Sequence, residues 1–483
     1  MFAVASPPVS RAWAQVRAAW AEFPVKVGLI GTCIVAIGSL TPAYLPQASP
    51  LWPVLRSAGM DGQLGRILGT ILTVSGVFLL LDAWFRLRHQ VYAELRPLAI
   101  IGIWSLPFLI APPIFSHDIY SYGAQGWMIH NGQNPYDGGP GLVPGPFTDY
   151  TPWVWRYSAA PYGPLALQIS RLMAELSGGQ PWLAAGLLRI PALIGVVCIV
   201  ELLPRLGRAV GADIRQIHWF GCLNPLLVID YVGGGHNDAW MMGLVAVGLW
   251  LATRPRWWPL AAVLIGVAAS IKQPAILAAL FLPLLTLPFD SWRSKQALVA
   301  VGRSLASLAI AVVAFILISW ACGLGFGWIE AMTVPGSSAS FSPSYIIGSL
   351  LQQLDPGSQW STLVTRIALG IGVLVIAFAI LRFGPQRPMK ALSWSWIAAA
   401  VCAPALRPWY LLWGFLLLPF SSSKRVVPWP AVLTVIALLC YSAINLGDRN
   451  GFFAIIAAIV CTAVWVAHIV IYHRLWQNIK RHK

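Results

Sequence analysis

Charged residues are scarce in this sequence. They make up 10% of the 483 residues, while 58% are hydrophobic, and an ordinary soluble domain carries about 25% charged residues. This shortage excludes a soluble globular protein. The apolar residues run in blocks long enough for a membrane helix, which needs roughly 20 residues, and they lack the apolar–polar alternation of a membrane strand. The composition therefore predicts an all-α polytopic integral membrane protein.

Paired cysteine motifs are also missing. The seven cysteines lie singly in apolar or glycine-rich segments, with no CxxC spacing. This pattern argues against a structural zinc site and against a disulfide framework. We interpret them as small buried apolar side chains. They are Cys33, Cys198, Cys222, Cys322, Cys402, Cys440 and Cys461.

Acidic residues are few: 16 against 32 basic residues, for a net charge of +16. In a soluble protein such a surplus would suggest nucleic-acid binding. Here most lysines and arginines gather in the short connectors on one side of the predicted spans, as the positive-inside rule requires. The charges therefore predict a multi-pass plasma-membrane protein with both termini in the cytoplasm and no nucleic-acid partner.

The apolar runs predict about 13–14 transmembrane helices, some of them short for a full crossing. No soluble domain or internal repeat interrupts them, so residues 1–483 are predicted to form one integral membrane unit. The candidate spans are centred on 26–42, 67–85, 98–115, 183–203, 217–232, 238–252, 257–271, 274–289, 300–322, 361–382, 391–405, 408–420, 428–446 and 451–472.

Two long connectors lie on the side opposite the basic residues, at 116–182 and 323–360. Both carry more acidic than basic side chains in their loop portions. Within the first, residues 165–176 read as a helix too short to span, which we expect to lie at the outer membrane surface. Because binding and catalytic residues concentrate in such loops, function is expected at the extracytoplasmic face.

Asp118 follows the third span and places a carboxylate at the outer membrane boundary. An ionisable group at this depth is costly unless it has a function, and a carboxylate held there could act as a general base. The alternative is structural, because Ser116 or Asp118 could simply cap the helix expected over 119–130.

Aromatic and acidic residues alternate through the rest of this loop, at 134–137, 149–155 and 160–164. Tyrosine and tryptophan favour the membrane–water boundary, so these rings could be interfacial anchors. They could equally stack on the apolar faces of sugars. The mixture of rings and carboxylates favours a polyhydroxylated ligand.

A second polar cluster follows three consecutive glycines at 233–235. Glycine permits a tight turn here, which would bring His236, Asn237 and Asp238 close to a ligand. A metal site is thinly supported by one histidine and one aspartate. Capping of the next helix by Asn237 or Asp238 is the other interpretation.

Two cations lie on the outer side, against the charge bias: Lys272 and Arg407. Each falls between two closely spaced spans, at the depth of a lipid phosphate, so binding a phosphate or pyrophosphate group is one reason for their presence. Snorkelling to outer-leaflet lipid is the alternative. Arg189 and Arg366, inside apolar segments, are candidates to pair with carboxylates such as Glu175 or Glu201.

Six ordered motifs give the chain a resemblance to a known family. It resembles the polyprenol-phosphate-mannose-dependent α-(1→6)-mannopyranosyltransferases of mycobacteria and corynebacteria, which belong to the GT-C class of membrane glycosyltransferases. The motifs are His117-Asp118-Ile119-Tyr120-Ser121-Tyr122, Gly132-Gln133-Asn134-Pro135-Tyr136, Ala160-Pro161-Tyr162-Gly163-Pro164-Leu165, Asn224-Pro225-Leu226, Gly234-Gly235-His236-Asn237-Asp238 and Arg407-Pro408-Trp409-Tyr410-Leu411-Leu412-Trp413.

The resemblance implies a GT-C-type helical bundle and a reaction. Mannose would pass from a polyprenyl-phosphate-mannose donor to the 6-hydroxyl of an α-1,6-mannan or phosphatidylinositol-mannoside-type acceptor, with inversion. The product would be the mannan backbone of lipomannan and lipoarabinomannan. No cofactor or metal is implied, and the partners are the two substrates and membrane lipid.

The resemblance also implies roles for the motif residues. Asp118, in the loop at 116–182, would be the catalytic base, and His117 would orient it or bind the donor. Lys272 and Arg407 would hold the departing phosphate. The substrate-binding candidates are His117, Tyr120, Tyr122, Tyr136, Tyr162, His236, Asn237 and Asp238.

Two other functions fit parts of the pattern. A sibling transferase could use another polyprenyl-phosphate sugar, because sugar identity depends on a few hydroxyl contacts. A lipid-linked sugar transporter or flippase would instead show midplane charges, broken helices and an internal repeat, none of which is prominent in the sequence.

Overall fold

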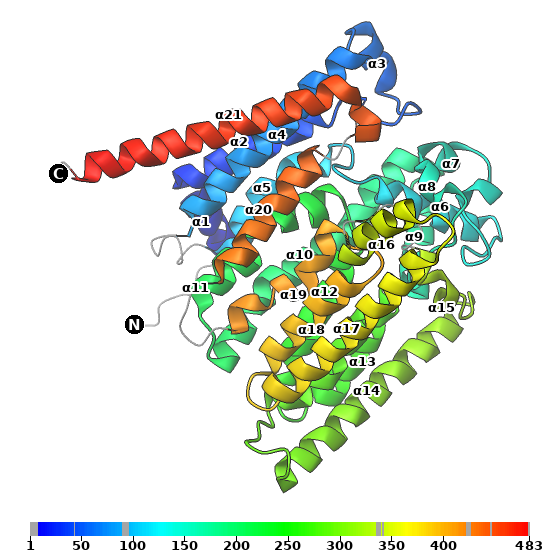
Figure 1. The fold of residues 1–483 in the computed structure, drawn as a ribbon, viewed down its shortest axis with the longest axis vertical. Coiled ribbons are helices and arrows are strands. Elements are labelled where there is room, and N and C mark those ends of the chain that lie inside the picture. The colour runs from blue at the N-terminus through cyan, green and yellow to red at the C-terminus, as the bar shows by residue number, and fades with distance from the viewer. Residues whose placement is uncertain are drawn as a thin grey trace. The chain divides into compact units, whose positions relative to one another are not determined.

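The computed structural model describes residues 8–42, 44–88, 96–334, 340, 342–421, 427–444 and 447–481. Every regular element in these ranges is a helix (Figure 1), which confirms the predicted all-α class. The chain divides into two compact units, one of Met1–His117 with Val432–Lys483 and the other of Asp118–Ala431. The prediction of one integral membrane unit is not tested by this division, because both units contain candidate spans.

The first unit is built around two closely packed helices, α2 (Phe23–Gly38) and α4 (Gln63–Arg86). Gly31 and Gly76 allow this approach, since a Cβ added to Gly31 would lie 2.7 Å from the Gly76 carbonyl oxygen. Small residues at helix contacts are the usual means of close packing in membranes. The other helices of this unit are α1 (Pro8–Ala21), α3 (Trp52–Ser57), α5 (Pro97–Ser105), η2 (Leu106–Leu109), most of α20 (Trp429–Ile444) and α21 (Gly447–Arg481).

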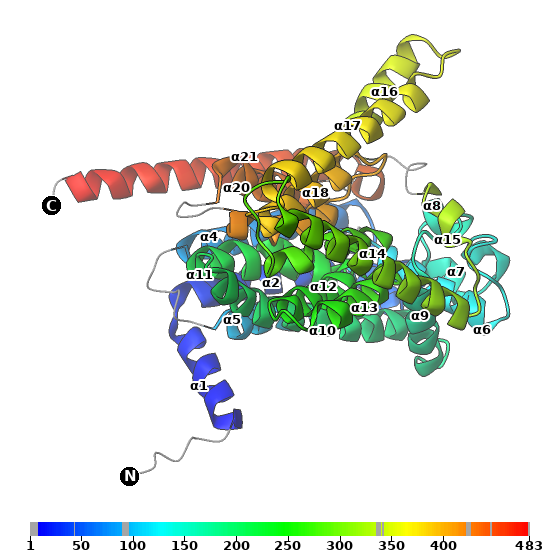
Figure 2. The same ribbon diagram turned by 90° about the horizontal axis from the view of Figure 1, so that it is seen from below.

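The first outer loop opens the second unit with four helices that lie together at one end of it (Figures 1 and 2). They are α6 (Asp118–His130), α7 (Pro146–Tyr150), α8 (Trp153–Arg156) and α9 (Pro164–Leu176), with the short η3 (Pro140–Leu142) between α6 and α7. The contact of α6 with α9 is close, because a Cβ on Gly126 would lie 2.3 Å from the Ser170 carbonyl carbon. The helix expected over 165–176 is confirmed as α9.

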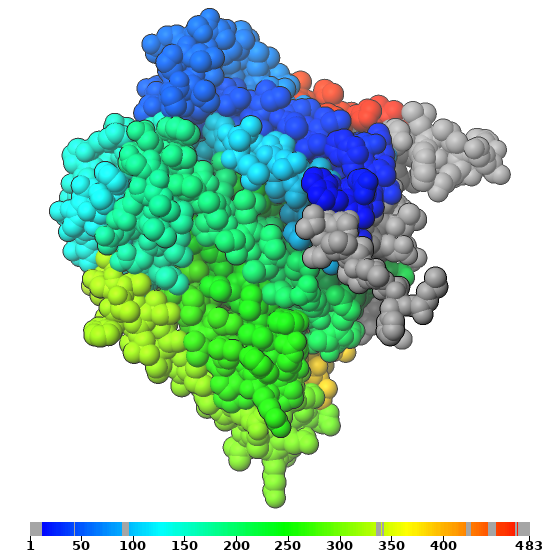
Figure 3. All heavy atoms as spheres, turned by 180° about the vertical axis from the view of Figure 1, so that it is seen from behind, coloured from blue at the N-terminus to red at the C-terminus, as the bar shows by residue number. Residues whose placement is uncertain are grey.

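The middle of the second unit alternates regular helices with irregular ones. Its backbones meet at Gly195 and Gly243, where a Cβ on Gly243 would lie 2.5 Å from the Gly195 Cα. In Figure 3 the teal to green residues of this part of the chain cover much of the visible face of the unit. The elements are α10 (Pro181–Val210), α11 (Ile214–Gln216), the π-helices η4 (Ile217–Cys222) and η5 (Leu227–Gly233), α12 (Asp238–Ala252), α13 (Trp258–Ala269), the 3₁₀-helices η6 (Gln273–Phe281) and η7 (Pro283–Leu285), and α14 (Lys295–Ala321).

The last third of the second unit contains the neighbouring helices α16 (Pro343–Leu354) and α17 (Trp360–Phe383). α17 packs against α18, and the end of the pair that holds α16 projects beyond the other helices of the unit (Figure 2). The remaining elements are α15 (Trp328–Ala331), α18 (Pro388–Cys402), η9 (Pro408–Leu411), α19 (Leu412–Phe415) and η10 (Leu418–Ser421).

Five helices among the described residues are long and apolar enough to cross a membrane: α4, α10, α14, α17 and the Gly451–His468 part of α21. The pair Ala12–Ala21 and Phe23–Gly38, bent by 89°, would be a sixth. Six shorter apolar helices of 10–17 residues leave the predicted count of about 13–14 spans open.

Four of the predicted spans are not continuous α-helices. Residues 98–115 contain the end of α5 followed by η2, and residues 217–232 form η4 and η5. Residues 274–289 begin with η6 and η7, and residues 408–420 form η9, α19 and η10. Proline contributes to these interruptions, because it removes a backbone donor and clashes with the preceding turn, although α10 stays helical around Pro191 and Pro204. Proline recurs in the interrupted segments at positions 107, 112, 113, 225, 274, 283, 288, 408 and 419.

Candidate active site

Asp118 is the first residue of α6, and its side chain is 15% exposed. Its Oδ1 accepts a hydrogen bond of 2.9 Å from the indole nitrogen of Trp155 in α8, and its Oδ2 lies 4.0 Å from Nδ1 of His236. A carboxylate in the first turn of α6 also interacts favourably with the helix dipole, which fits the alternative role of Asp118 in stabilising the start of this helix. The carboxylate is thus held from two sides while part of it stays accessible.

His236 is fully buried between two aromatic residues. Its Nδ1 lies 3.2 Å from the hydroxyl of Tyr122, and its ring stacks on Trp409 with centroids 3.6 Å apart. Burial lowers the pKa of His236 well below its usual range, and the nearby cations Lys272 and Arg407 lower it further. The imidazole is therefore neutral, and its contact with Asp118 is not an ion pair.

The glycine run before His236 is required by this arrangement. Gly235 has a φ of +64°, in the left-handed region, and a Cβ there would lie 2.2 Å from Ile119 Cδ1. A Cβ on Gly234 would lie 3.0 Å from Nε2 of His236 itself. The buried guanidinium of Arg189 donates to the Gly233 carbonyl oxygen over 3.2 Å. The turn therefore brings the histidine ring against α6 only because these positions have no side chain.

Lys272 and Asp238 form a buried ion pair, with Nζ and Oδ2 2.7 Å apart. The other carboxylate oxygen accepts a 2.7 Å hydrogen bond from the Trp413 indole. The ammonium group also lies 4.4 Å from the ring centre of Tyr410 and under 6 Å from those of Trp413 and Tyr162. Burial alone would lower the pKa of Lys272, but Asp238 raises it above its usual value, so the lysine stays charged.

Tyr162 brings the first outer loop beside this pair. The next residue, Gly163, donates its backbone N–H to the Ile271 carbonyl over 3.0 Å, directly before Lys272. The Tyr162 carbonyl accepts from the Tyr136 hydroxyl at 2.8 Å, and its ring meets that of Tyr122 edge-on at 5.0 Å. Burial raises the pKa of all three tyrosines, so their hydroxyls stay protonated and can donate hydrogen bonds.

Arg407 is half-buried at the start of η9, and the second outer loop fixes the segment before it. Ser340 accepts from the Leu406 backbone N–H over 2.7 Å, and the Ser342 hydroxyl donates to the Pro404 carbonyl over 2.9 Å. The predicted loops at 116–182 and 323–360 therefore both contribute to the surroundings of this site.

Direct contacts connect most of the predicted site residues: Asp118, Tyr122, Tyr136, Tyr162, His236, Asp238 and Lys272. Tyr120 packs edge-on against Tyr150 at 5.1 Å, and Asn237 is buried in the turn. His117 belongs to the first unit, where its Nε2 contacts the Tyr44 carbonyl oxygen at 2.6 Å. His236 and Trp155 are two of the second unit's groups that contact Asp118. The roles assigned to all these residues remain predictions.

Four aromatic residues of this site were not predicted as such: Trp155, Trp409, Tyr410 and Trp413. All four lie in segments that the sequence analysis singled out. The sequence does not show which rings contact each other. An aromatic residue that anchors the chain at the membrane surface therefore looks the same in the sequence as one that packs around a site.

The predicted pairing of Arg189 or Arg366 with Glu175 or Glu201 is wrong. Glu175 accepts from Arg171 at 2.7 Å, and Glu201 from Arg205 at 2.9 Å, each one turn away in its own helix. Short-range partners at i and i+4 are geometrically favoured over distant ones. Within the described residues, no three His, Cys, Asp or Glu side chains gather as metal ligands.

Comparison with known proteins identifies the family. The protein-family model described as alpha-(1->6)-mannopyranosyltransferase, N-terminal domain, matches residues 25–288 of the chain. The chain belongs to this family. It is therefore a membrane glycosyltransferase of the mannosyltransferase type, as the sequence motifs implied.

Individual relatives agree over most of their length. This mannosyltransferase is 29% identical to an α-(1→6)-mannopyranosyltransferase of Mycobacterium tuberculosis, over 91% of the chain and 85% of the relative. It is 30% identical to α-(1→6)-mannopyranosyltransferase A of the same organism, over 84% and 81%. For α-(1→6)-mannopyranosyltransferase A of Corynebacterium glutamicum the identity is 28%, over 87% and 93%. No solved structure matches the chain.

Proposed function

We propose that this mannosyltransferase transfers mannose from polyprenyl-phosphate-mannose to the 6-hydroxyl of an α-1,6-mannan or phosphatidylinositol-mannoside-type acceptor, with inversion. Its product would extend the mannan backbone of lipomannan and lipoarabinomannan. The observation that carries the proposal is the Asp118 carboxylate, held by Trp155 and His236 yet partly accessible. The family membership supports the sugar and the linkage.

Asp118 is the proposed base. Inversion in a single displacement needs one group to take the proton of the attacking hydroxyl, on the side opposite the leaving phosphate. Burial keeps His236 neutral, so its contact with the carboxylate is between a neutral ring and an anion. The Trp155 hydrogen bond fixes one oxygen, and the other oxygen is the one that faces the acceptor.

Arg407 is the proposed main contact of the leaving phosphate. Guanidinium binds phosphate oxygens through paired hydrogen bonds and stabilises the charge that develops as the sugar–phosphate bond breaks. Lys272 contributes less directly in this proposal, because Asp238 already neutralises its charge. Its ammonium group would orient Tyr410 and Tyr162 around the donor.

The aromatic and polar residues around these groups are the proposed sugar contacts. The protonated hydroxyls of Tyr122 and Tyr162 can donate to sugar oxygens, and Asn237 offers an amide. The same proposal includes Tyr120, Tyr136, His236 and Asp238 as residues that shape the pocket, and His117 as a donor contact.

The orientation of the site is also a proposal. The excess of basic residues in the short connectors supports cytoplasmic termini and an extracytoplasmic position for the loops at 116–182 and 323–360. In a plasma membrane this places the chemistry outside the cell, where a lipid-bound sugar donor can be used without nucleotide.

The alternative donor is another polyprenyl-phosphate sugar, and a transport role gains some support from the irregular helices η4, η5 and η6. One assay separates these functions. Purified protein is given mannosyl-, glucosyl- or arabinosyl-phosphopolyprenol with a short α-1,6-mannoside, and the product is analysed for linkage and anomeric configuration.

We expect product with the mannosyl donor alone, carrying a new α-1,6 bond. Transfer of a different sugar would replace the proposed donor. Movement of the labelled donor across the bilayer of proteoliposomes, with no new glycosidic bond from any donor, would replace the transferase proposal with a transport function.

A further inference from the structure

Arg366 has no role in the proposed reaction, and its position needs an explanation. It lies in α17, six residues after the helix begins, in one of the candidate membrane spans. The side chain is exposed, and within the described part of the chain its guanidinium makes no hydrogen bond or ion pair. An unpaired cation in an apolar helix is unfavourable unless an anion or water reaches it.

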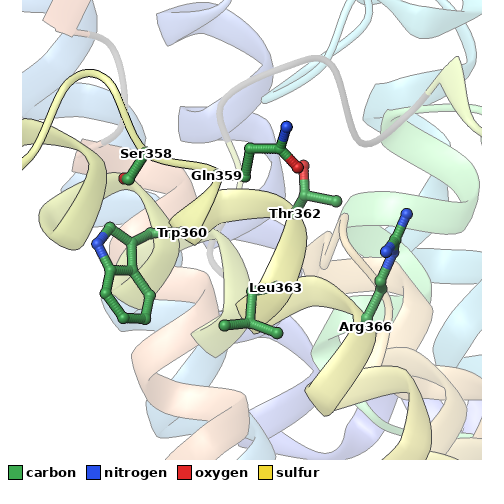
Figure 4. A pocket seen from close by; sticks show the side chains of 6 residues that line it. All are labelled: Ser358, Gln359, Trp360, Thr362, Leu363 and Arg366. Carbon is green, nitrogen blue, oxygen red and sulfur yellow. The ribbon is translucent and has the colours of Figure 1, made fainter.

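A hollow of about 360 Å³ surrounds the start of α17 and reaches Arg366 (Figure 4). Gln359, Thr362 and Arg366 follow one another at helical spacing and share one face of the helix. Figure 4 shows their side chains on the same side. The lining is completed by Ser358, Trp360 and Leu363.

The chemistry of this lining suits a charged head group with hydroxyls. A guanidinium binds a phosphate diester through paired hydrogen bonds, and the positive end of the α17 dipole also favours an anion. The amide of Gln359 and the hydroxyl of Thr362 can bond to several hydroxyl groups. The Ser358 hydroxyl donates to the Asp355 carbonyl oxygen over 2.7 Å, so it can only accept from a ligand. Trp360, 39% exposed, offers a ring face at the membrane boundary.

The depth of the hollow fits the head-group region of a membrane. Arg366 lies roughly 9 Å along the axis from the helix start, at 1.5 Å per residue. The other end of α17 carries Arg382, and the connector that follows holds Arg387 and Lys390. By the charge rule that end is cytoplasmic, so the hollow faces the outer leaflet.

We propose that the hollow at 358–366 binds the head group of an anionic phospholipid whose phosphate carries a polyol such as inositol. The phosphate contacts Arg366 and the polyol contacts Gln359, Thr362 and Ser358. This site is separate from the Asp118 chemistry. Because phosphatidylinositol also anchors the proposed phosphatidylinositol-mannoside-type acceptor, the inference rests in part on the proposed function and adds a contact for the lipid end of that acceptor.

The test is a binding measurement without sugar substrates. The full-length protein is placed in phosphatidylcholine nanodiscs that contain either phosphatidylinositol or phosphatidylserine, and the lipid retained after release is counted by native mass spectrometry. Phosphatidylserine is anionic but has no polyol. Arg366→Gln is compared with Arg382→Gln, a matched loss of charge at the other end of the same helix.

We expect the wild type and Arg382→Gln to retain phosphatidylinositol in preference to phosphatidylserine, and Arg366→Gln to lose affinity about tenfold, the effect of one lost charge-assisted contact. Equal retention of phosphatidylinositol and phosphatidylserine by the wild type would contradict the proposed recognition of the polyol. Equal retention by both variants, or displacement of the lipid by inorganic phosphate alone, would overturn the site. The experiment measures lipid binding and no sugar transfer, so its result can still be interpreted if the proposed transfer reaction is wrong.

Discussion

At the scale of single residues, the site depends on a carboxylate and a histidine that do not share a proton. Asp118 and His236 are 4.0 Å apart, and burial together with Lys272 and Arg407 lowers the pKa of the histidine. A neutral imidazole can position the carboxylate without neutralising it. The titration of His236 should therefore affect folding at low pH.

His236 lies in the turn at 233–238, outside the candidate spans. Its pKa is lower in the folded chain than the unfolded value of about 6.5. As the pH falls through that value, the unfolded chain binds a proton at this position and the folded chain does not, so this contribution to stability is present above pH ~6.5 and is lost below it. We expect His236→Gln to lose less stability than the wild type between about pH 7.5 and pH 5.

Thermal unfolding of detergent-purified protein measures this difference. His130→Gln is the comparison variant. His130 is an exposed histidine on the helix that begins with Asp118, and it pairs with Glu175 at the surface, where an ion pair contributes little to stability. His236→Gln should therefore change the pH dependence of stability more than His130→Gln does. Identical pH dependence for His236→Gln and the wild type would contradict the neutral, buried state of this histidine.

The residues proposed to carry the chemistry could be named from sequence, whereas their contact partners could not. Asp118, His236, Asp238, Lys272 and Arg407 stand out as ionisable groups at turns and span ends. Their partners are indoles far along the chain: Trp155 is 37 residues from Asp118, and Trp413 is 175 residues from Asp238. Such contacts depend on how loops return to the site, which no local pattern encodes.

At the scale of secondary-structure elements, the Lys272–Asp238 pair joins the start of α12 to the break between α13 and η6. Both side chains are buried, and the carboxylate is completed by Trp413 from α19. The pair therefore holds three parts of the second unit together.

Removing one member of this pair should destabilise the protein strongly. Asp238→Asn leaves a buried lysine without its counter-charge, and Lys272→Met leaves a buried carboxylate, each at a cost of about 3–5 kcal/mol. The double variant Asp238→Asn with Lys272→Met removes both charges, so it should be more stable than either single variant. Chemical unfolding of the purified variants provides the comparison.

A double variant no more stable than the singles would show that the pair is not the structural connection described here. Single variants as stable as the wild type would contradict the buried ion pair itself. Transfer activity is a separate readout, because the double variant can fold and still bind the donor poorly.

The elements were predicted well where the apolar run was uninterrupted, as in α4, α10, α14 and α17. They were predicted poorly at 217–232, 274–289 and 408–420, where hydropathy marks a span and proline replaces the α-helix by π or 3₁₀ turns. Hydropathy records burial in an apolar medium and does not specify the backbone conformation. The site is built on these irregular segments, at His236, Lys272 and Arg407.

At the scale of the whole molecule, the small number of charged residues predicted the fold class. The gathering of basic residues in the connectors on one side of the spans predicted the orientation in the membrane. Both inferences rest on bulk physical properties, so they needed no family knowledge. The donor and the acceptor came instead from motifs shared with relatives, because no property of the composition specifies a sugar.

Orientation can be tested by cysteine accessibility. In a cysteine-free background, Asp137→Cys in the first long loop should react with a membrane-impermeant maleimide in intact cells. Arg293→Cys, in the connector before α14, should react only after the cells are opened. Both positions are exposed, so burial does not explain a difference. The reverse labelling pattern would contradict the proposed extracytoplasmic site.

The central claim is that Asp118 is the base of a mannosyl transfer. The most direct measurement is the transfer rate of purified Asp118→Asn, with Asp149→Asn as the control because Asp149 is an exposed carboxylate in the same loop. We expect Asp118→Asn to bind the donor, keep its unfolding temperature and lose about 10²–10⁴-fold in rate, while Asp149→Asn keeps the wild-type rate. A folded Asp118→Asn that transfers mannose at the wild-type rate would contradict the assignment of the base.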